Sequence, residues 1–234
     1  MTRWTLVARA GADANADGPV RDQALEELCA VYYHPIYTYA LCSGTRADNA
    51  MDLTQGFFEH AIRNDVFARA DAEKGRLRSF LLTAFKNFAA AEHRNATAAK
   101  RGGGQGVASL DEEDRHGVPA IDRIKHDGLT PEEAYDKAFA LVQLDRALAI
   151  LREEKDEAGK GELFDHLRPY LQGDGESYDT VARVLQMPPE TARVQVHRMR
   201  KRLGEIFRAV VFDSVGDPGL ADDEIRALRQ ALES

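Results

Sequence analysis

Apolar residues recur every three or four positions between residues 177 and 208, in two runs separated by a pair of prolines. The first run comprises Tyr178, Val181, Ala182 and Leu185, and the second comprises Ala192, Val196, Met199, Leu203 and Phe207. This spacing places each run along one side of an α-helix. Ser177 is suited to cap the first helix, and a proline suits the first turn of the second. The pattern predicts a short helix, a tight turn and a long helix.

A basic face lies opposite the apolar stripe of the second helix. At about 100° per residue, the residues that cluster there are Glu190, Val194, His197, Arg198 and Lys201, with Arg193 and Arg202 on the flanks. Residues 190–208 contain six lysines and arginines and two glutamates, a net charge of +4 in a chain whose total is −8. A charged helix face is usually only solvated, but a short helix, a Met-Pro turn and a long basic helix are typical of a helix-turn-helix. We therefore expect the second helix to enter the major groove of DNA.

Similar periodicity predicts helices through most of the chain, and no segment shows a convincing β-strand pattern. The predicted helices span about 20–41, 47–64, 77–100, 130–151, 162–171 and 222–232. Pro35 is expected to kink or break the first of these helices near His34. Thr130 and Pro131, followed by two glutamates, mark the start of the fourth. The predicted fold class is all-α.

Glycine and charge divide the chain into two small helical domains. The first is predicted over 1–100 and the second over 131–212, with a linker at 101–130 and an acidic C-terminal tail at 213–234. Nine acidic residues between Asp111 and Asp136 are offset by three basic ones, so the linker is expected to be acidic as well as flexible. Its RGGGQG segment is not a dinucleotide fingerprint, because the glycine spacing differs and a helix precedes it.

The first domain has a basic segment of its own. Residues 69–101 contain eight lysines and arginines against three acidic residues, a net charge of +5, and they include several phenylalanines. Cations mixed with aromatic residues suit single-stranded nucleic acid, whose bases stack while its phosphates meet the cations. The phenylalanines suit a hydrophobic core equally well. The outer face of the predicted helix at 47–64 is instead acidic, and a solvated surface is the simplest interpretation of that pattern.

Overall composition narrows the function classes. The total charge of −8 is unusual for a free-standing DNA-binding protein, so tight binding to DNA is expected to need a partner. No run approaches eighteen apolar residues and no signal-peptide pattern is present, so we expect a cytoplasmic protein with no membrane span. The two cysteines, Cys29 and Cys42, suit a reducing compartment. The seven histidines have no metal-ligand spacing and no catalytic motif is found, so we expect no enzyme activity, no cofactor and no metal.

Taken together, these features resemble the extracytoplasmic-function sigma factors of bacterial RNA polymerase, over nearly the whole chain. The segments that carry the resemblance are DLTQGFF at 52–58, GRLRSFLL at 75–82, KNF at 86–88, KRGGG at 100–104 and VHRMRKRL at 196–203. The resemblance implies a sigma region 2-like bundle in the first domain and a sigma region 4-like helix-turn-helix in the second. It implies promoter DNA and the core polymerase, through its β′ clamp helices and β flap, as partners.

The resemblance also implies site residues. Binding to the β′ clamp helices would involve Asp48, Asp52 and Gln55. Binding to the −10 element of the promoter would involve Lys74, Arg76, Arg78, Phe80 and Asn87. The −35 element would be recognised by Arg193, Val194, His197 and Arg198, while Arg200, Lys201 and Arg202 would hold phosphates. A bidentate contact from arginine to guanine contributes about 1–3 kcal/mol of discrimination, whereas phosphate contacts position the helix without specifying sequence.

The helix predicted at 47–64, which the resemblance places against the β′ clamp helices, departs from the family pattern. Where the family commonly has Asp-Ala-Glu-Asp, this chain has Asn-Ala-Met-Asp at 49–52, which is two negative charges short. Thr54 is expected on the flank of the same face, and a phosphothreonine there would add roughly −1.5 to −2 charges. Because some sigma factors of this type are switched on by a Ser/Thr kinase, phosphorylation of Thr54 is a hypothesis. The alternative is that Thr54 is a semi-buried helix residue. The sequence gives no sign of an anti-sigma factor.

Another class of protein fits part of the pattern. A stand-alone helix-turn-helix regulator would bind duplex DNA without polymerase, normally as a dimer on spaced half-sites. The acidic total charge and the second basic segment argue against it. A gel shift with and without core polymerase distinguishes the two, because only the regulator binds tightly alone.

Overall fold

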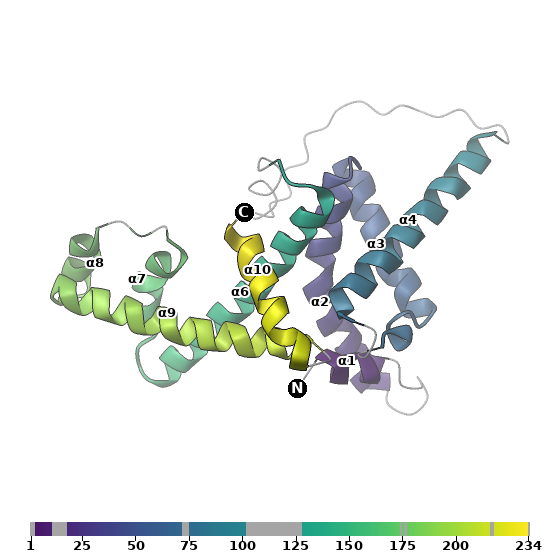
Figure 1. Ribbon diagram of the computed structural model, residues 1–234. Helices are drawn as coiled ribbons and strands as arrows, with labels where there is room; N and C mark the ends of the chain where they lie inside the picture. Colours follow the sequence, from purple (N-terminus) through teal and green to yellow (C-terminus); the bar gives the residue numbers. More distant parts are fainter. Residues whose placement is uncertain are drawn as a thin grey trace. The chain divides into compact units, whose positions relative to one another are not determined.

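The computed structural model describes residues 3–10, 18–71, 75–101, 128–173, 175, 177–215 and 218–233, and within these ranges the chain is all-α (Figure 1). The α-helices are α1 (Arg3–Ala10), α2 (Gly18–Cys42), α3 (Ala47–Arg63), α4 (Leu77–Arg101), α6 (Pro131–Glu157), α7 (Gly161–Gln172), α8 (Tyr178–Val184), α9 (Pro189–Phe212) and α10 (Ala221–Glu233). Two short 3₁₀ helices are η1 (Phe67–Arg69) and η3 (Pro218–Leu220). The predicted fold class is therefore confirmed. None of the described helices combines the length and the apolar character needed to cross a lipid bilayer.

The chain divides into two compact units. Unit 1 comprises residues 1–140 together with 213–234, and unit 2 comprises residues 141–212. This division differs from the expected domains, because the first ten residues of α6 and the whole C-terminal segment join unit 1. The expected linker at 101–130 lies almost entirely outside the described residues.

Apolar side chains explain why the start of α6 joins unit 1. Tyr135 and Phe139 are fully buried. Phe139 stacks on Tyr32 of α2 with 5.5 Å between ring centroids, and the Tyr135 hydroxyl donates a hydrogen bond to the backbone carbonyl of Arg78 at 2.9 Å. Burying each large apolar side chain stabilises the fold by about 1.5–3 kcal/mol. The glutamates and threonine that begin α6 mark a helix start, but they do not mark a domain boundary.

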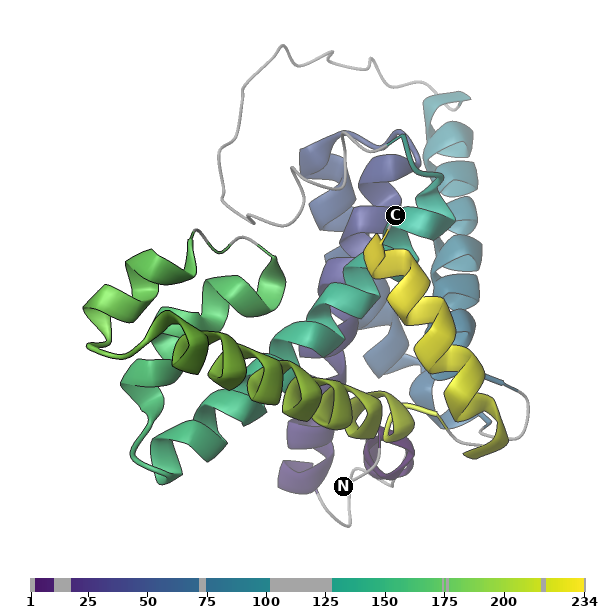
Figure 2. The ribbon, with the colours of Figure 1, turned by 60° about the vertical axis from the view of Figure 1, so that its left-hand side comes forward.

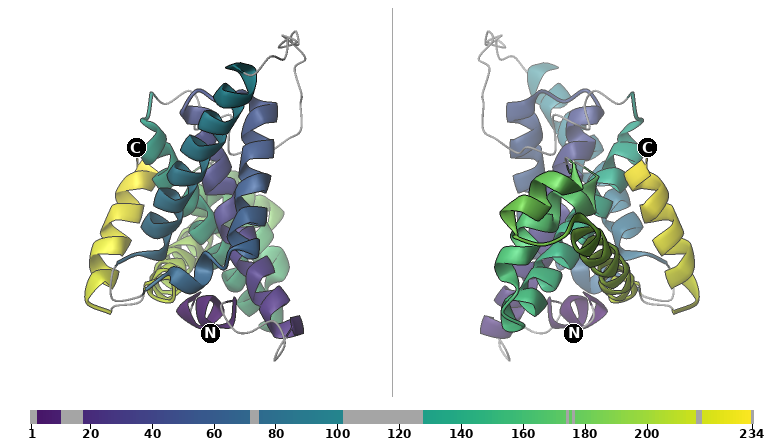
Figure 3. Two further views of the ribbon diagram at one scale, coloured as in Figure 1. Left: turned by 90° about the vertical axis from the view of Figure 1, so that its right-hand side faces the viewer. Right: turned by 90° about the vertical axis from the view of Figure 1, so that its left-hand side faces the viewer.

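The core of unit 1 lies where α2, α3 and α4 pack side by side (Figures 1 and 3). On α3, Ala50, Phe57 and Ala61 are buried along one side, as their spacing predicts. The Phe57 ring lies 5.4 Å from the Phe85 ring of α4, in an edge-to-face arrangement that aromatic pairs favour. This packing fixes the distance between α3 and α4, which border the candidate site.

Helix α2 continues through Pro35 to Cys42, so the expected break near His34 does not occur. An internal proline costs a helix about 3 kcal/mol or more. Tyr32 and Ile36, one on each side of Pro35, are fully buried in the core. Their burial, at about 1.5–3 kcal/mol each, is large enough to offset that cost.

Unit 2 contains the predicted helix-turn-helix. The Ser177 hydroxyl caps α8 by accepting a hydrogen bond from the Asp179 amide at 3.2 Å, which confirms the predicted cap. Helix α9 begins at Pro189, and its predicted stripe is buried. The turn between the helices contains Gln186 in the left-handed region, with φ of 50°. Figure 2 shows α8 and α9 joined at this turn, with α7 alongside.

Two ion-pair clusters on the surface of unit 2 are expected to make its stability depend on pH. Hydrogen bonds from Arg202 lower the pKa of Glu154, and hydrogen bonds from Arg152 lower the pKa of Asp165. A lowered folded-state pKa adds stability above the ordinary carboxylate pKa, and this stability is lost as pH falls through the lowered value. We expect the melting temperature to fall as the pH is lowered from about 7 to about 3. The fall should be smaller in the variant Glu154→Gln/Asp165→Asn, which lacks both carboxylates. Thermal melts followed by circular dichroism test this, and an equal fall in both proteins would contradict it.

Candidate nucleic-acid interface

A groove in unit 1 runs between helix α4 on one side and the end of α3 with η1 on the other. Two adjoining hollows of about 560 and 520 Å³ form it, and both are lined by Arg69, Phe80 and Thr83. The first hollow extends to Arg76 at the start of α4, and the second extends along α4 past Asn87. The groove follows from the helical repeat, because residues 80, 83, 84, 87 and 88 share one face of α4.

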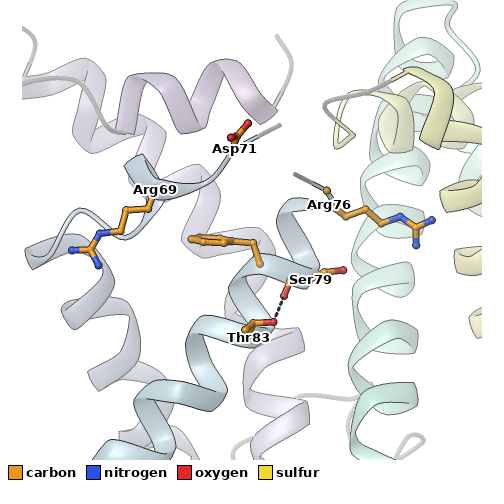
Figure 4. A pocket seen from close by; sticks show the side chains of 7 residues that line it. Arg69, Asp71, Arg76, Ser79 and Thr83 are labelled. Carbon is orange, nitrogen blue, oxygen red and sulfur yellow. Dashed lines mark hydrogen bonds between the residues drawn. The ribbon is translucent and has the colours of Figure 1, made fainter. Parts of the chain in front are cut away.

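The chemistry of the groove suits a nucleotide strand. Arg69 and Arg76 line the groove, with the guanidinium of Arg76 paired with Glu224, and Asp71 and Glu92 line it too. The Phe80 ring is half-buried in both hollows. Figure 4 shows the two guanidinium groups pointing away from each other, on opposite sides of the start of α4. Asn87, which is exposed, provides both a donor and an acceptor of hydrogen bonds. An aromatic face flanked by cations and amides can hold one base and the neighbouring phosphates.

Three of the five residues expected at the −10 element line this groove: Arg76, Phe80 and Asn87. Lys74 lies outside the described residues. Arg78 does not line the groove, and the expectation that it is available to DNA is wrong. It is two residues from Phe80, which places it about 200° around α4, on the opposite face. That angle is a signal in the sequence that could have excluded Arg78.

Arg78 is instead buried in a cluster of charges, with only 6% of its surface exposed. Its Nε donates to Glu224 Oε1 of α10 at 2.5 Å, and its Nη2 donates to Glu224 Oε2 at 3.2 Å. Its Nη1 donates to Asp136 of α6. Burial acts to lower the pKa of the guanidinium, but the hydrogen bond and charge of Glu224, with the charge of Asp136, raise the pKa overall. Arg78 is therefore a structural residue that links α4 to the C-terminal helix.

Sequence reasoning missed several residues of the groove. Arg69, Thr83 and His60 line it, and so does Asn95, which lies eight residues after Asn87 on the same face of α4. The spacing of the two asparagines is a signal that could have found Asn95. Arg69 reaches the groove through η1, where its Nη2 donates to the Asn64 carbonyl at 3.1 Å. No local pattern predicts that placement, because η1 is positioned by the packing of Phe67 in the core.

The outer face of α3 is exposed where the sequence predicts it. Asp48, Asp52 and Gln55 are all exposed, and Met51 exposes 43% of its surface between them. Methionine is enriched at protein-binding surfaces, whereas aspartate is more common on solvated ones. We define these four residues as the α3 outer face.

Thr54 is not on the flank of the α3 outer face, and that expectation is wrong. Its exposed fraction is 0%, and its hydroxyl donates a hydrogen bond to the Ala50 carbonyl at 2.7 Å. Thr54 therefore follows Ala50 on the buried side of α3, four residues apart and one turn along. A kinase cannot reach this hydroxyl while α3 is packed as it is here, so phosphorylation of Thr54 has no support from the structure.

A second candidate surface lies on α9 in unit 2. Val194, His197, Arg198 and Lys201 are exposed on the side away from the buried stripe. Arg193 is also exposed, although it donates to Glu190 at 3.1 Å and lies over the Tyr178 ring. This surface matches the predicted basic face.

Two arginines expected to hold phosphates make contacts within unit 2 instead. Arg200 Nη2 donates to the Tyr170 carbonyl of α7 at 2.6 Å. Arg202 donates to both carboxylate oxygens of Glu154 on α6, at 2.6 and 3.0 Å, and to Glu205. These contacts hold α9 to its neighbours, which leaves Arg198 and Lys201 as the exposed cations best placed for DNA.

Within the ranges that the structure describes, no group of three or more histidine, cysteine or acidic side chains is arranged to hold a metal ion. Burial raises the pKa of the Cys29 thiol to about 11, which disfavours the reactive thiolate there.

Comparison of the chain with known protein families, with curated proteins and with solved structures gave no match.

Proposed function

We propose that this protein is a sigma factor of the extracytoplasmic-function type, which directs core RNA polymerase to specific promoters. The observation that carries the proposal is the groove of unit 1, where Arg69 and Phe80 line two adjoining hollows of nucleotide size, one of which reaches Arg76 and the other Asn87. A groove of this kind and a helix-turn-helix with an exposed basic face occur in one chain. One part suits single-stranded DNA and the other suits duplex DNA, and both are present at a promoter that is being opened.

In this proposal the groove holds an unpaired base of the −10 element. Stacking of a base on an aromatic side chain contributes about 1–3 kcal/mol, which helps to offset the cost of taking that base out of the duplex. Phe80 provides the ring, Asn87 the hydrogen bonds, and Arg69 and Arg76 the positive charge for phosphates. The protein would melt DNA with binding energy alone and would need no catalytic group or cofactor.

Helix α9 reads the −35 element in this proposal, and the α3 outer face binds the clamp helices of the polymerase β′ subunit. Binding to polymerase would supply the attraction to DNA that a chain of net charge −8 lacks. The protein would accordingly act in the cytoplasm, where polymerase and promoter DNA are found.

Binding to polymerase is tested by pull-down with purified bacterial core enzyme. Wild type is expected to be retained, and the charge reversal Asp52→Lys is expected to reduce retention. The matched control is Asp145→Lys, which makes the same change at an exposed aspartate of α6. Failure of the wild type to bind core enzyme, or equal retention of both variants, would refute the proposed role of the α3 outer face.

Arg198→Ala is expected to weaken recognition of a −35 duplex by about 5- to 150-fold, the range that corresponds to 1–3 kcal/mol for an arginine–guanine contact. Run-off transcription with core enzyme on genomic fragments identifies a promoter, and competition with variant duplexes then measures the effect. Arg202→Ala is the comparison, because its guanidinium is bound to Glu154 in unit 2. Equal effects of the two changes would contradict the assignment. Tight, specific binding of duplex without core enzyme would favour a stand-alone regulator.

A further inference from the structure

We infer that helix α10 competes with nucleic acid for Arg76 at the start of α4, with the Glu224 carboxylate in the position of a phosphate. The inference rests on the proposed function of the groove. The Glu224 carboxylate accepts from Arg76 Nε at 2.9 Å and from two nitrogens of Arg78. Arginine binds carboxylates and phosphates through the same planar arrangement of donors. Glu224 therefore occupies Arg76, a cation of the groove that an incoming strand would otherwise use, and links it to the buried Arg78.

Arg76 connects the groove to α10. It lines the first hollow of the groove, and its guanidinium is also bound to Glu224. In Figure 4 its side chain extends away from Arg69, toward the helices of the C-terminal part of the chain. The side chain exposes 28% of its surface, so rotation into the groove is open to it once Glu224 is removed. Arg76 is thus the cation for which α10 and a nucleic acid would compete directly.

Acidic side chains also pair with the other cations in the first half of α4. Between residues 75 and 86 the chain has three cations, Arg76, Arg78 and Lys86, and each is paired with an acid from α6 or α10. Lys86 binds Glu132 at 2.6 Å, and Arg78 binds Asp136 as well as Glu224. Acids from distant parts of the sequence therefore mask the basic segment that the sequence alone predicts to bind nucleic acid.

Helix α10 is suited to leave this position. It runs beside the first turns of α4 (Figures 2 and 3). At 13 residues it is about the shortest length at which an isolated helix begins to form in water. Its place is held by Ile225 and Leu228, which are buried, and by Glu224. A phosphate that draws Arg76 into the groove removes one charge partner of the buried Glu224, which then favours release of α10.

The test compares two amide substitutions on α10 in the full-length chain. Glu224→Gln removes the buried carboxylate, and Asp223→Asn removes one charge from an exposed neighbour that pairs with Arg226 of the same helix. Each protein is titrated against a fluorescein-labelled 12-nucleotide single-stranded DNA of mixed sequence, and anisotropy is measured at several salt concentrations. Circular dichroism spectra establish that each variant is folded.

We expect Glu224→Gln to bind the oligonucleotide more tightly than Asp223→Asn does. The affinity of Glu224→Gln should also fall more steeply with salt. The slope of the logarithm of the binding constant against the logarithm of salt concentration should steepen by about 0.7 for each additional phosphate contact to a single strand. The control should keep the slope of the wild type. If Glu224→Gln and Asp223→Asn give the same affinity and slope, α10 is not a competitor.

Hydrogen exchange of the wild-type protein provides a second measurement that needs no variant. Saturating oligonucleotide should increase amide exchange in residues 219–233 while it protects the first half of α4. Unchanged or slower exchange in 219–233 on the bound protein would overturn the inference, even where Glu224→Gln fails to fold. If none of the proteins binds the oligonucleotide, either alone or with core polymerase, the proposed function fails and the inference fails with it.

Discussion

Arg78→Met is expected to lower the free energy of unfolding by about 3 kcal/mol, because it leaves the Glu224 carboxylate buried with half of its charge partners removed. Glu224 exposes only 2% of its surface, so water cannot replace the lost hydrogen bonds. The removal of one partner from a buried ion pair generally costs about 3–5 kcal/mol. We expect the lower end of this range because Arg76 still contacts Glu224. Urea unfolding followed by circular dichroism measures the change.

Two further proteins separate charge burial from the loss of contacts. In Arg78→Met/Glu224→Leu both charges are replaced by apolar groups, and stability should return to within about 1 kcal/mol of the wild type. Arg226→Met removes an arginine from an exposed pair on α10, and a change under about 1 kcal/mol is expected. If the single change at Arg78 is as mild as the change at Arg226, the buried cluster does not hold α10 to α4.

Thr54→Glu is expected to destabilise the protein by about 3–5 kcal/mol, because it places a larger and charged side chain in a space where Thr54 is fully buried. The introduced carboxylate should have a raised pKa in the folded protein, since burial disfavours its charged form. A raised folded-state pKa means that the folded variant loses stability as pH rises. The destabilisation caused by Thr54→Glu should therefore be smaller at about pH 5 than at about pH 8. Urea unfolding at the two pH values measures both effects.

The neighbouring residue offers a matched control for this prediction. Gln55→Glu introduces the same carboxylate one residue along α3, on the exposed outer face, and should change stability by less than about 0.5 kcal/mol. The comparison also tests which of the two positions of α3 can accept an additional negative charge. If Thr54→Glu is stable and binds core polymerase better than Gln55→Glu does, then α3 adopts another packing and Thr54 is accessible after all.

The ion pairs in the first half of α4 and the acidic composition of this chain both act against binding to DNA. A net charge of −8 opposes binding to DNA at long range, and the pairing of Arg76, Arg78 and Lys86 with acids opposes it at short range. Under the proposed function, both effects keep the free protein off DNA until polymerase is bound. The groove itself contains Arg69 and Asn87, so it stays available to a strand that polymerase presents.

Sequence by itself determined the features that depend on the helical repeat. The buried stripe of α9, the Ser177 cap, the exposed Asp48 and Asp52 and the all-α fold follow from neighbours within one or two turns of the same helix. Such patterns are local, because apolar spacing of 3.6 residues fixes which side of a helix faces the core. The burial of Thr54 could also have been predicted from its four-residue spacing to Ala50, which is buried.

Only the tertiary structure decided which helices meet and therefore which charges are paired. Arg78 and Glu224 are 146 residues apart in sequence, and no periodicity relates two positions at that distance. The tail that looked separate joins unit 1 because Ile225 and Leu228 are buried there, and Arg202 is engaged because α6 lies beside α9 in unit 2. Whether a basic side chain is free for DNA depends on its partners in space, and these are set by the packing of the whole unit.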